Sequence, residues 1–272
     1  MSEPLLGGQQ PSVPGVYDCL LGGKDHFAAD RAFAEDLVQR VPRVVQMAQA
    51  NRTFLRRAVR HAVSLGFHQF LDLGSGLPSG QNVHEIVGGM VGQRERVGVV
   101  YVDRDPVVAV HGRAYLETSE WVRVVQRDFT DPEAVLADHT VRGVVDFDQP
   151  VVLVFASVLH FVGGCAAGLV RAYLEASRAG GAVIISHVQR PDTVDDDHIG
   201  ELESRYQEVM GTGTARTRTE ILDLFNCALG TRLVEPGLVN VEDWRPDRTE
   251  DGAGDNPLPF LAGMGIFGRR DG

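Results

Sequence analysis

From residue 67 onward the chain alternates short apolar runs with segments of helix length. The apolar runs lie at residues 69–73, 97–102, 122–126, 151–155 and 182–186. Their continuous Val, Leu and Ile content is typical of parallel strands that are covered on both faces. The segments near residues 80–91, 106–117, 131–138 and 165–178 have the length of crossover helices. This alternation predicts a parallel sheet built from βαβ units.

The residues before this alternation predict a helical extension. Residues 1–14 are rich in Gly, Pro, Ser and Gln and carry little apolar surface, so we expect a flexible tail. A helical pattern begins at Asp25, which is a capping residue type, and Pro42 separates it from a longer amphipathic helix that ends near Leu65 and Gly66. The predicted parts are therefore a tail (1–14), an N-terminal helical cap (15–66) and one α/β domain (67–272).

The last part of the chain predicts two more helices and two more strands. The acidic run 195–197 leads into one helical segment, and residues 217–224 form another. Strand candidates at residues 232–235 and 264–267 flank a Pro- and Gly-rich excursion and could form an antiparallel hairpin. The expected fold is a mostly parallel sheet of about seven strands, with helices on both faces.

Composition narrows the classes of function. The formal net charge of -11 and pI near 5.2 disfavour a general binder of nucleic-acid phosphates. Three widely spaced cysteines form neither a disulfide framework nor a metal knuckle, so we expect buried free thiols. No apolar window approaches the roughly 20 residues of a membrane span, and no basic leader precedes an apolar stretch. We therefore expect a cytoplasmic protein without a membrane partner.

Glycines and acids follow three of the predicted strands. Gly74-Ser75-Gly76 comes directly after the first strand, where missing side chains permit close approach of a ligand or simply a tight turn. Asp103 ends the second strand, at the position where dinucleotide folds place an acid on ribose hydroxyls. Asp128 and Phe129 follow the third and could meet an adenine. Because these strand ends meet at one sheet edge, the sequence predicts an adenosine pocket.

These residues resemble the class I methyltransferases, and more closely the Methyltransf_19 group of S-adenosyl methyltransferases, formerly a domain of unknown function. The matching segments cover nearly the whole chain, and they are VYDCLLGGKDHFAAD (16–30), ANRTFLRRAVR (50–60), GSGLP (74–78), NVHE (82–85), YVDRDPV (101–107) and VLHF (158–161). The resemblance implies a Rossmann-like fold, S-adenosylmethionine as methyl donor and S-adenosylhomocysteine as product. It implies these cofactor-binding residues: Tyr17, Gly22, Gly23, Asn51, Asp72, Gly74, Ser75, Gly76, Asp103, Arg104, Asp128, Phe129, Ala156 and Ser157.

The same resemblance suggests that the N-terminal segment folds over the cofactor. Tyr17, the glycines at 22 and 23, Phe27 and Asn51 are the candidates for closing the pocket. The aromatics could instead be core residues, the glycines a turn and Asn51 a surface residue. Trp244, in the excursion near the C-terminus, could rim the acceptor pocket or pack inside a long loop.

Methyl transfer requires a nucleophile held in line with the methyl–sulfur bond at about 3–3.5 Å, and no metal is chemically required. His160 follows the fourth strand and could be a general base, because imidazole titrates near neutrality, or could be hydrogen-bonded inside its loop. His187 has a weaker claim to the same role. The expected acceptor is a small molecule, although a natural product, another metabolite and a protein side chain are not distinguished. The oligomeric state is left open.

Two other functions use the same features. An NAD(P)-dependent oxidoreductase would share the glycine turn and Asp103, but none of the five tyrosines begins a Tyr-x-x-x-Lys pair. A non-catalytic protein that binds S-adenosylmethionine would keep the whole pocket without turnover. The favoured prediction is an S-adenosylmethionine-dependent methyltransferase.

Overall fold

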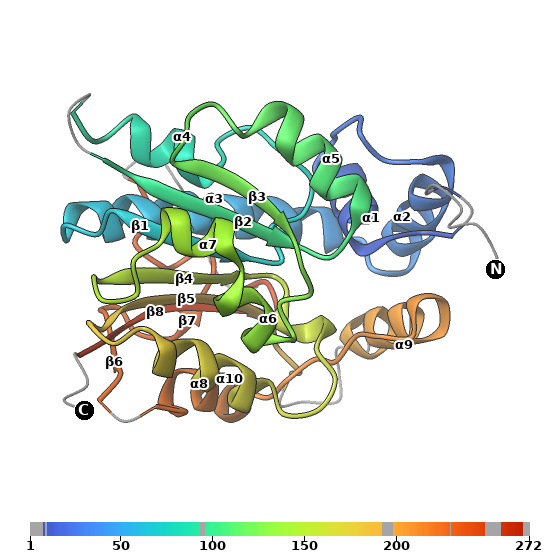
Figure 1. The fold of residues 1–272 in the computed structure, drawn as a ribbon. Coiled ribbons are helices and arrows are strands. Elements are labelled where there is room, and N and C mark those ends of the chain that lie inside the picture. The colour runs from blue at the N-terminus through green and yellow to red at the C-terminus, as the bar shows by residue number, and fades with distance from the viewer. Residues whose placement is uncertain are drawn as a thin grey trace.

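A mixed sheet of eight strands forms the centre of the molecule (Figure 1). The computed structural model describes residues 8, 10–92, 96–191, 198–228, 230–247 and 257–268. The strand order is β3-β2-β1-β4-β5-β8-β6, with β7 paired to β8. The predicted Rossmann-like fold is confirmed, and the predicted number of seven strands is one too few, since β7 is a two-residue strand that shows no periodicity.

The five predicted parallel strands are all present. In chain order the strands are β1 (Gln69–Leu73), β2 (Gly98–Asp103), β3 (Val122–Gln126), β4 (Val151–Ala156), β5 (Gly181–Val188), β6 (Arg232–Leu233), β7 (Val239–Asn240) and β8 (Phe260–Phe267). β8 lies antiparallel between β5 and β6, as the predicted C-terminal hairpin requires. The carboxyl ends of β1 to β5 therefore share one edge of the sheet.

Helices cover both faces of the sheet (Figure 1). One face packs against α3 (Val44–Ser64), α4 (Val83–Gly88) and α5 (Pro106–Tyr115), and the other against α6 (Pro132–Ala137), α7 (His139–Val144), α8 (Ala166–Ala176) and α10 (Arg218–Asn226). The predicted helix at 131–138 is thus the first of two short helices, because Asp138 ends α6 and caps α7.

The N-terminal helices and α9 lie beyond the carboxyl ends of the parallel strands (Figure 1). They are α1 (Val13–Leu20), α2 (Ala28–Arg40) and α9 (His198–Met210). Two ion pairs join α2 to α9, between Asp36 and Arg205 at 2.8 Å and between Arg40 and Glu201 at 2.7 Å. The acidic run 195–197, predicted to lead into a helix, lies outside the described residues.

The boundary of the predicted tail is wrong. Ser12 caps α1, which begins at Val13, so helical structure begins inside the segment 1–14. The carboxylate of Asp30 is 1% exposed and accepts hydrogen bonds from the backbone N–H groups of Ser12 and Phe27, both at 2.7 Å. These contacts also place the N-cap of α2 at Phe27, not at Asp25. Residues 1–7 and 9 lie outside the described residues.

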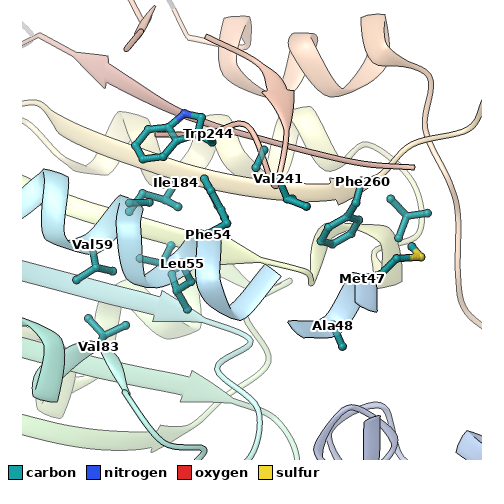
Figure 2. Packing of buried hydrophobic residues seen from close by; sticks show 14 of the residues in the cluster. Met47, Ala48, Phe54, Leu55, Val59, Val83, Ile184, Val241, Trp244 and Phe260 are labelled. Carbon is teal, nitrogen blue, oxygen red and sulfur yellow. The ribbon is translucent and has the colours of Figure 1, made fainter. Parts of the chain in front are cut away.

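Trp244 belongs to the core and does not rim a pocket. Its side chain is fully buried, and its ring meets the ring of Phe54 edge to face, with centroids 5.4 Å apart (Figure 2). The guanidinium of Arg57 donates to the carbonyl oxygens of Trp244 at 2.8 Å and Val241 at 2.5 Å. The C-terminal excursion is therefore anchored to α3.

The three cysteines are free, but only Cys19 and Cys227 are half-buried. Cys165 is exposed, and its sulfur caps α8 by accepting from the backbone N–H of Gly168 at 3.2 Å. The expectation that all three thiols are buried is therefore wrong. Within the described ranges, no helix is both long enough and apolar enough to cross a membrane.

Replacing Trp244 by alanine should lower the free energy of unfolding by about 3–5 kcal/mol, because the variant loses a buried aromatic and leaves a cavity beside Phe54. Urea unfolding followed by circular dichroism measures this loss. The matched control is Trp121→Ala, since Trp121 is half-buried at the surface under Arg96. The control substitution should lower the free energy of unfolding by only about 1 kcal/mol. Equal losses in the two variants would contradict the anchoring role.

Candidate functional site

A cavity of about 330 Å³ lies at the carboxyl ends of β1 to β4, a size within the range of about 300–1,000 Å³ typical of small-molecule sites. Residues of α1, α3 and α9 complete its wall. Twelve of the fourteen cofactor-binding residues named from the sequence line it, namely Tyr17, Asn51, Asp72, Gly74, Ser75, Gly76, Asp103, Arg104, Asp128, Phe129, Ala156 and Ser157. We call it the larger cavity.

The glycine turn after β1 is held by Asp103. Gly74 and Gly76 have φ angles of 74° and 69°, in the left-handed region that favours glycine. A Cβ at Gly74 would lie 2.3 Å from the side chain of Val158, so no larger residue fits there. The carboxylate of Asp103 accepts from the backbone N–H of Gly76 at 2.9 Å and of Asp105 at 3.0 Å. Each oxygen keeps a lone pair for a further donor.

The acids of the larger cavity differ in their proton affinity. Burial raises the pKa of Asp72 to about 7, with Arg52 lowering it and Asp103 raising it further. Burial also raises the pKa of Asp103. Burial by itself would raise the pKa of Asp128, but hydrogen bonds from the N–H and hydroxyl of Thr130, at 2.9 and 2.7 Å, outweigh burial and lower this pKa. Asp128 therefore stays ionised at neutral pH, whereas Asp72 is poised to gain or lose a proton.

The charged side chains that line the larger cavity are mostly acidic. They are four carboxylates (Asp72, Asp103, Asp105 and Asp128) and two guanidinium groups (Arg52 and Arg104). One of the guanidinium groups, Arg104, donates to Asp128 at 3.4 Å. This excess of negative charge favours a ligand that carries positive charge.

A buried chain of hydrogen bonds connects the N-terminal helix to the strand ends. The backbone N–H of Ser157 donates to the hydroxyl of Ser186 at 2.9 Å, and that hydroxyl donates to Oδ1 of Asn51 at 2.5 Å. Nδ2 of Asn51 donates to the hydroxyl of Tyr17 at 2.7 Å, which in turn donates to the carbonyl of Ala48 at 3.2 Å. Asn51 is thus a buried link, not a surface residue.

Two serines at this edge have features that point to a ligand. Ser157 has a φ angle of 56°, a left-handed conformation that is rare for a residue with a side chain and is often found at functional sites. The buried hydroxyl oxygen of Ser75 has no hydrogen-bond partner among the described residues. A buried polar group in that condition needs a partner from outside the protein, such as a water molecule, an ion or a ligand.

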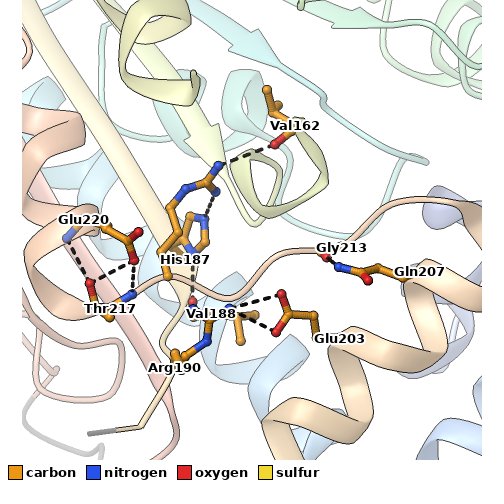
Figure 3. Close-up of polar contacts among 10 residues, drawn as sticks. Val162, His187, Val188, Arg190, Glu203, Gln207, Gly213, Thr217 and Glu220 are labelled. Carbon is orange, nitrogen blue, oxygen red and sulfur yellow. Dashed lines mark hydrogen bonds and ion pairs between the residues drawn. The ribbon is translucent and has the colours of Figure 1, made fainter. Parts of the chain in front are cut away.

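A second cavity of about 60 Å³ adjoins the first and contains His160 in its wall. Burial, helped by His187 and Arg216, holds the pKa of His160 well below its usual value, so the imidazole is neutral. Burial likewise lowers the pKa of His187 to about 3. Both nitrogens of His187 are engaged, since Nδ1 donates to the carbonyl of Val188 at 2.7 Å and Nε2 accepts from Arg216 at 2.6 Å (Figure 3). His187 is therefore not available as a base.

Three residues named from the sequence lie outside both cavities. Gly22 and Gly23 form the turn after α1, and a Cβ at Gly23 would lie 1.9 Å from the carboxylate of Asp18. Phe27 is 40% exposed and lies in neither wall. Packing of the turn against Asp18 explains the glycine at position 23.

Sequence reasoning missed several residues of the larger cavity. Arg52 adjoins Asn51 in a segment that the resemblance covers, but its charge was not assigned to the pocket. Ser12 and Pro14 lie in the predicted tail, where a capping residue two positions before a proline is the signal of a helix start. Tyr206 and Met210 come from α9, which no motif connects to the strand ends.

Comparison with known proteins gives a consistent result. The chain matches the model of the S-adenosyl methyltransferase family over residues 2–268. A candidate methyltransferase from Thermobifida fusca is 37% identical, with a TM-score of 0.86 over 95% of this chain and 96% of that one. A DUF574 family protein from Streptomyces avermitilis is 30% identical, with a TM-score of 0.87 over 95% and 98%. No curated protein matches the chain.

The likeness of the fold extends further than the likeness of the sequence. The plantazolicin methyltransferase BamL has a TM-score of 0.53 over 94% of this chain and 96% of its own. Because the identity is 8%, this similarity concerns the fold alone.

Asp72→Asn should change how stability depends on pH. The pKa of Asp72 is about 7 in the folded chain and about 3.9 in an unfolded one. Between these values the folded state holds more protons, so the free energy of unfolding falls as pH rises. The asparagine variant has no carboxyl group at position 72 to hold this proton, so it lacks this pH dependence. Relative to the wild type, its free energy of unfolding should therefore rise by about 2–3 kcal/mol from pH 5 to pH 8.

Urea unfolding of the ligand-free proteins at the two pH values measures this difference. The matched control is Asp128→Asn, since the pKa of Asp128 is lowered and its carboxylate is ionised throughout that range. The control should differ from the wild type by the same amount at both pH values. The same result for Asp72→Asn would contradict the raised pKa.

Proposed function

We propose that the larger cavity of this chain, which belongs to the S-adenosyl methyltransferase family, binds S-adenosylmethionine. The methyl group is transferred there to a small-molecule acceptor. The protein is an S-adenosylmethionine-dependent methyltransferase, and S-adenosylhomocysteine is its product. The placement of the cofactor, the roles of individual residues, the class of acceptor, a helical cap that begins at Ser12 instead of residue 15 and ends at residue 66, and a cytoplasmic location are parts of the proposal.

The residues of the larger cavity suit the three parts of the cofactor. Asp103 would accept from the ribose hydroxyls with the lone pairs that Gly76 and Asp105 leave free. Asp128 and Phe129 would meet the adenine. Arg52 and Asp72 would pair with the carboxylate and ammonium of the methionine part, since both groups line the cavity and the charge of Arg52 acts on Asp72. The unsatisfied hydroxyl of Ser75 would gain a partner.

The charge of the cavity is the observation that carries the proposal. S-adenosylmethionine brings an ammonium and a sulfonium against one carboxylate, so its net charge is positive. Four acidic side chains, of which Asp72 has a pKa of about 7, outnumber the two guanidinium groups, and this balance suits that ligand. The pyrophosphate of NAD or NADP would instead need cations or the N-terminus of a helix. Here Pro78 and Asn82 separate the glycine turn from α4, which begins only at Val83.

When bound, the cofactor supplies a methyl group on an electron-poor sulfur. The protein holds the acceptor in line with that group and excludes water. Tyr17 from α1, Phe161 from the short 3-10 helix after β4 (Leu159–Phe161) and Tyr206 from α9 line both cavities, so these side chains lie at their junction. The ion pairs between α2 and α9 hold α9, which lines both cavities, against the N-terminal helices.

Asp103→Asn should weaken the binding of S-adenosylmethionine and S-adenosylhomocysteine by about 10- to 100-fold, because an amide cannot accept at both positions. Isothermal titration calorimetry measures both affinities. The matched control is Asp105→Asn, which removes the same charge from the same cavity while asparagine still caps α5. This control should change the affinities by less than about 3-fold.

The titration also distinguishes the alternative cofactors. NAD and NADP at millimolar concentration should give no measurable heat with the wild-type protein. Tighter binding of NAD than of S-adenosylmethionine would overturn the proposal. Equal effects of the two asparagine variants would show that Asp103 acts only through its charge and does not hold the ribose.

A further inference from the structure

The smaller cavity has a different chemical character from the larger one. Most of its wall is apolar and comes from five elements, α1, α3, β5, α9 and β8, as the side chains of Leu20, Val44, Met47, Val188, Leu202 and Phe260 show. Tyr17, Ser157, Phe161 and Tyr206 line both cavities. A molecule seated in the smaller cavity would therefore lie directly beside the contents of the larger one.

The wall offers no free charge to a ligand. Among the described residues that line the smaller cavity, the only charged side chain is that of Glu203. Arg190 donates to both carboxylate oxygens of Glu203 at 3.2 Å (Figure 3). A charged group buried against the apolar wall would lose its hydration without gaining a partner. The cavity therefore favours a neutral ligand group.

His160 gives this wall one polar group with spare capacity. Its side chain is 7% exposed, and Nδ1 is buried without a hydrogen-bond partner among the described residues. The ring is held by packing, with centroid distances of 4.3 Å to Phe161 and 5.2 Å to His187. The backbone N–H of Thr214 donates to the carbonyl of His160 at 2.8 Å. The imidazole is therefore fixed in place while retaining capacity to bond a ligand.

We propose, on the basis of the function proposed above, that the methyl acceptor is a neutral alcohol. Its apolar group fills the smaller cavity, and its hydroxyl is hydrogen-bonded to His160. The cavity of about 60 Å³ limits the size of that group. With roughly 10–15 Å³ for each water-sized group, it accommodates about four to six non-hydrogen atoms. Any further part of the acceptor extends toward the junction at Ser157.

The transfer step balances with the groups in place. The hydroxyl oxygen of the acceptor forms a bond to the methyl carbon as the methyl–sulfur bond breaks, and the electron pair of that bond stays on sulfur. The hydroxyl proton passes to the neutral imidazole of His160 and then to water when the product leaves. The lowered pKa of His160 makes the ring a weak base, but a protonated ether is a far stronger acid than imidazolium.

Two methionines report on the two cavities separately. Met47 lines the smaller cavity, Met210 lines the larger cavity, and Met90 is 43% exposed and lines neither. The protein labelled with ¹³C at the methionine methyl groups is titrated first with S-adenosylhomocysteine and then with millimolar isopentyl alcohol. We expect the first ligand to shift the signal of Met210 and the second to shift that of Met47, with Met90 unchanged.

The charge preference is tested with probes of matched shape. Isopentylamine and isovalerate resemble isopentyl alcohol but are charged at pH 7.5. In the presence of S-adenosylhomocysteine, each should bind at least about 10-fold more weakly than the alcohol, as judged from the Met47 signal. Tighter binding of either charged probe would overturn the assignment of a neutral acceptor.

Two variants test the cavity and the histidine. Ala48→Leu fills the smaller cavity and should abolish the alcohol-induced shift of Met47, whereas Gln49→Leu, an exposed neighbour on α3, should preserve it. His160→Phe removes the hydrogen bond and should weaken alcohol binding by at least about 5-fold. All three variants should bind S-adenosylhomocysteine like the wild type, which confirms that they are folded.

The two proposals fail in different ways. If Met210 does not respond to S-adenosylhomocysteine, the cofactor is misplaced and the proposed function is overturned. If Met210 responds but the alcohol leaves Met47 unchanged, or binds equally well to Ala48→Leu, the acceptor is not seated in the smaller cavity. Unchanged alcohol binding in His160→Phe would overturn the role of the histidine alone.

Discussion

The arrangement of this molecule depends on the buried hydrogen bonds that run from Ser157 through Ser186 and Asn51 to Tyr17. Ser186 and Asn51 are buried and Ser157 and Tyr17 are half-buried, and removing one member would leave its neighbour without a partner, at a cost of about 1–3 kcal/mol. This series of hydrogen bonds joins the ends of β4 and β5 to α3 and α1. The position of the N-terminal helix relative to the strand ends is therefore fixed by the core itself.

This constraint explains why two cavities of opposite character lie side by side. The glycine turn and the acids at the ends of β1 to β3 make one wall polar and negatively charged. The apolar faces of α1, α3 and α9 make the other wall, which contains His160 but no unpaired charge among its described residues. A cation and a neutral alcohol can thus be held beside each other, each in the surroundings that suit it.

Much of the fold and of the larger cavity follows from local sequence patterns. Buried parallel strands appear in the sequence as continuous apolar runs, and the residues that follow them meet at one edge of the sheet. The turn at Gly74 and Gly76, Asp103 and Asp128 could therefore be placed together. Positions that depend on tertiary contacts could not be predicted. The start of α1 depends on Asp30, eighteen residues away. The burial of Trp244 and the position of α9 at the cavity depend on packing partners that the spacing of residues along the sequence does not reveal.

A crystal structure with S-adenosylhomocysteine would test the central claim most directly. We predict the ribose hydroxyls within about 2.6–3.2 Å of the carboxylate of Asp103, the sulfur facing the junction at Ser157, and α1 in place above the ligand. A ligand bound outside the larger cavity, or bound there only with α1 displaced and the contact between Tyr17 and Asn51 broken, would contradict the claim.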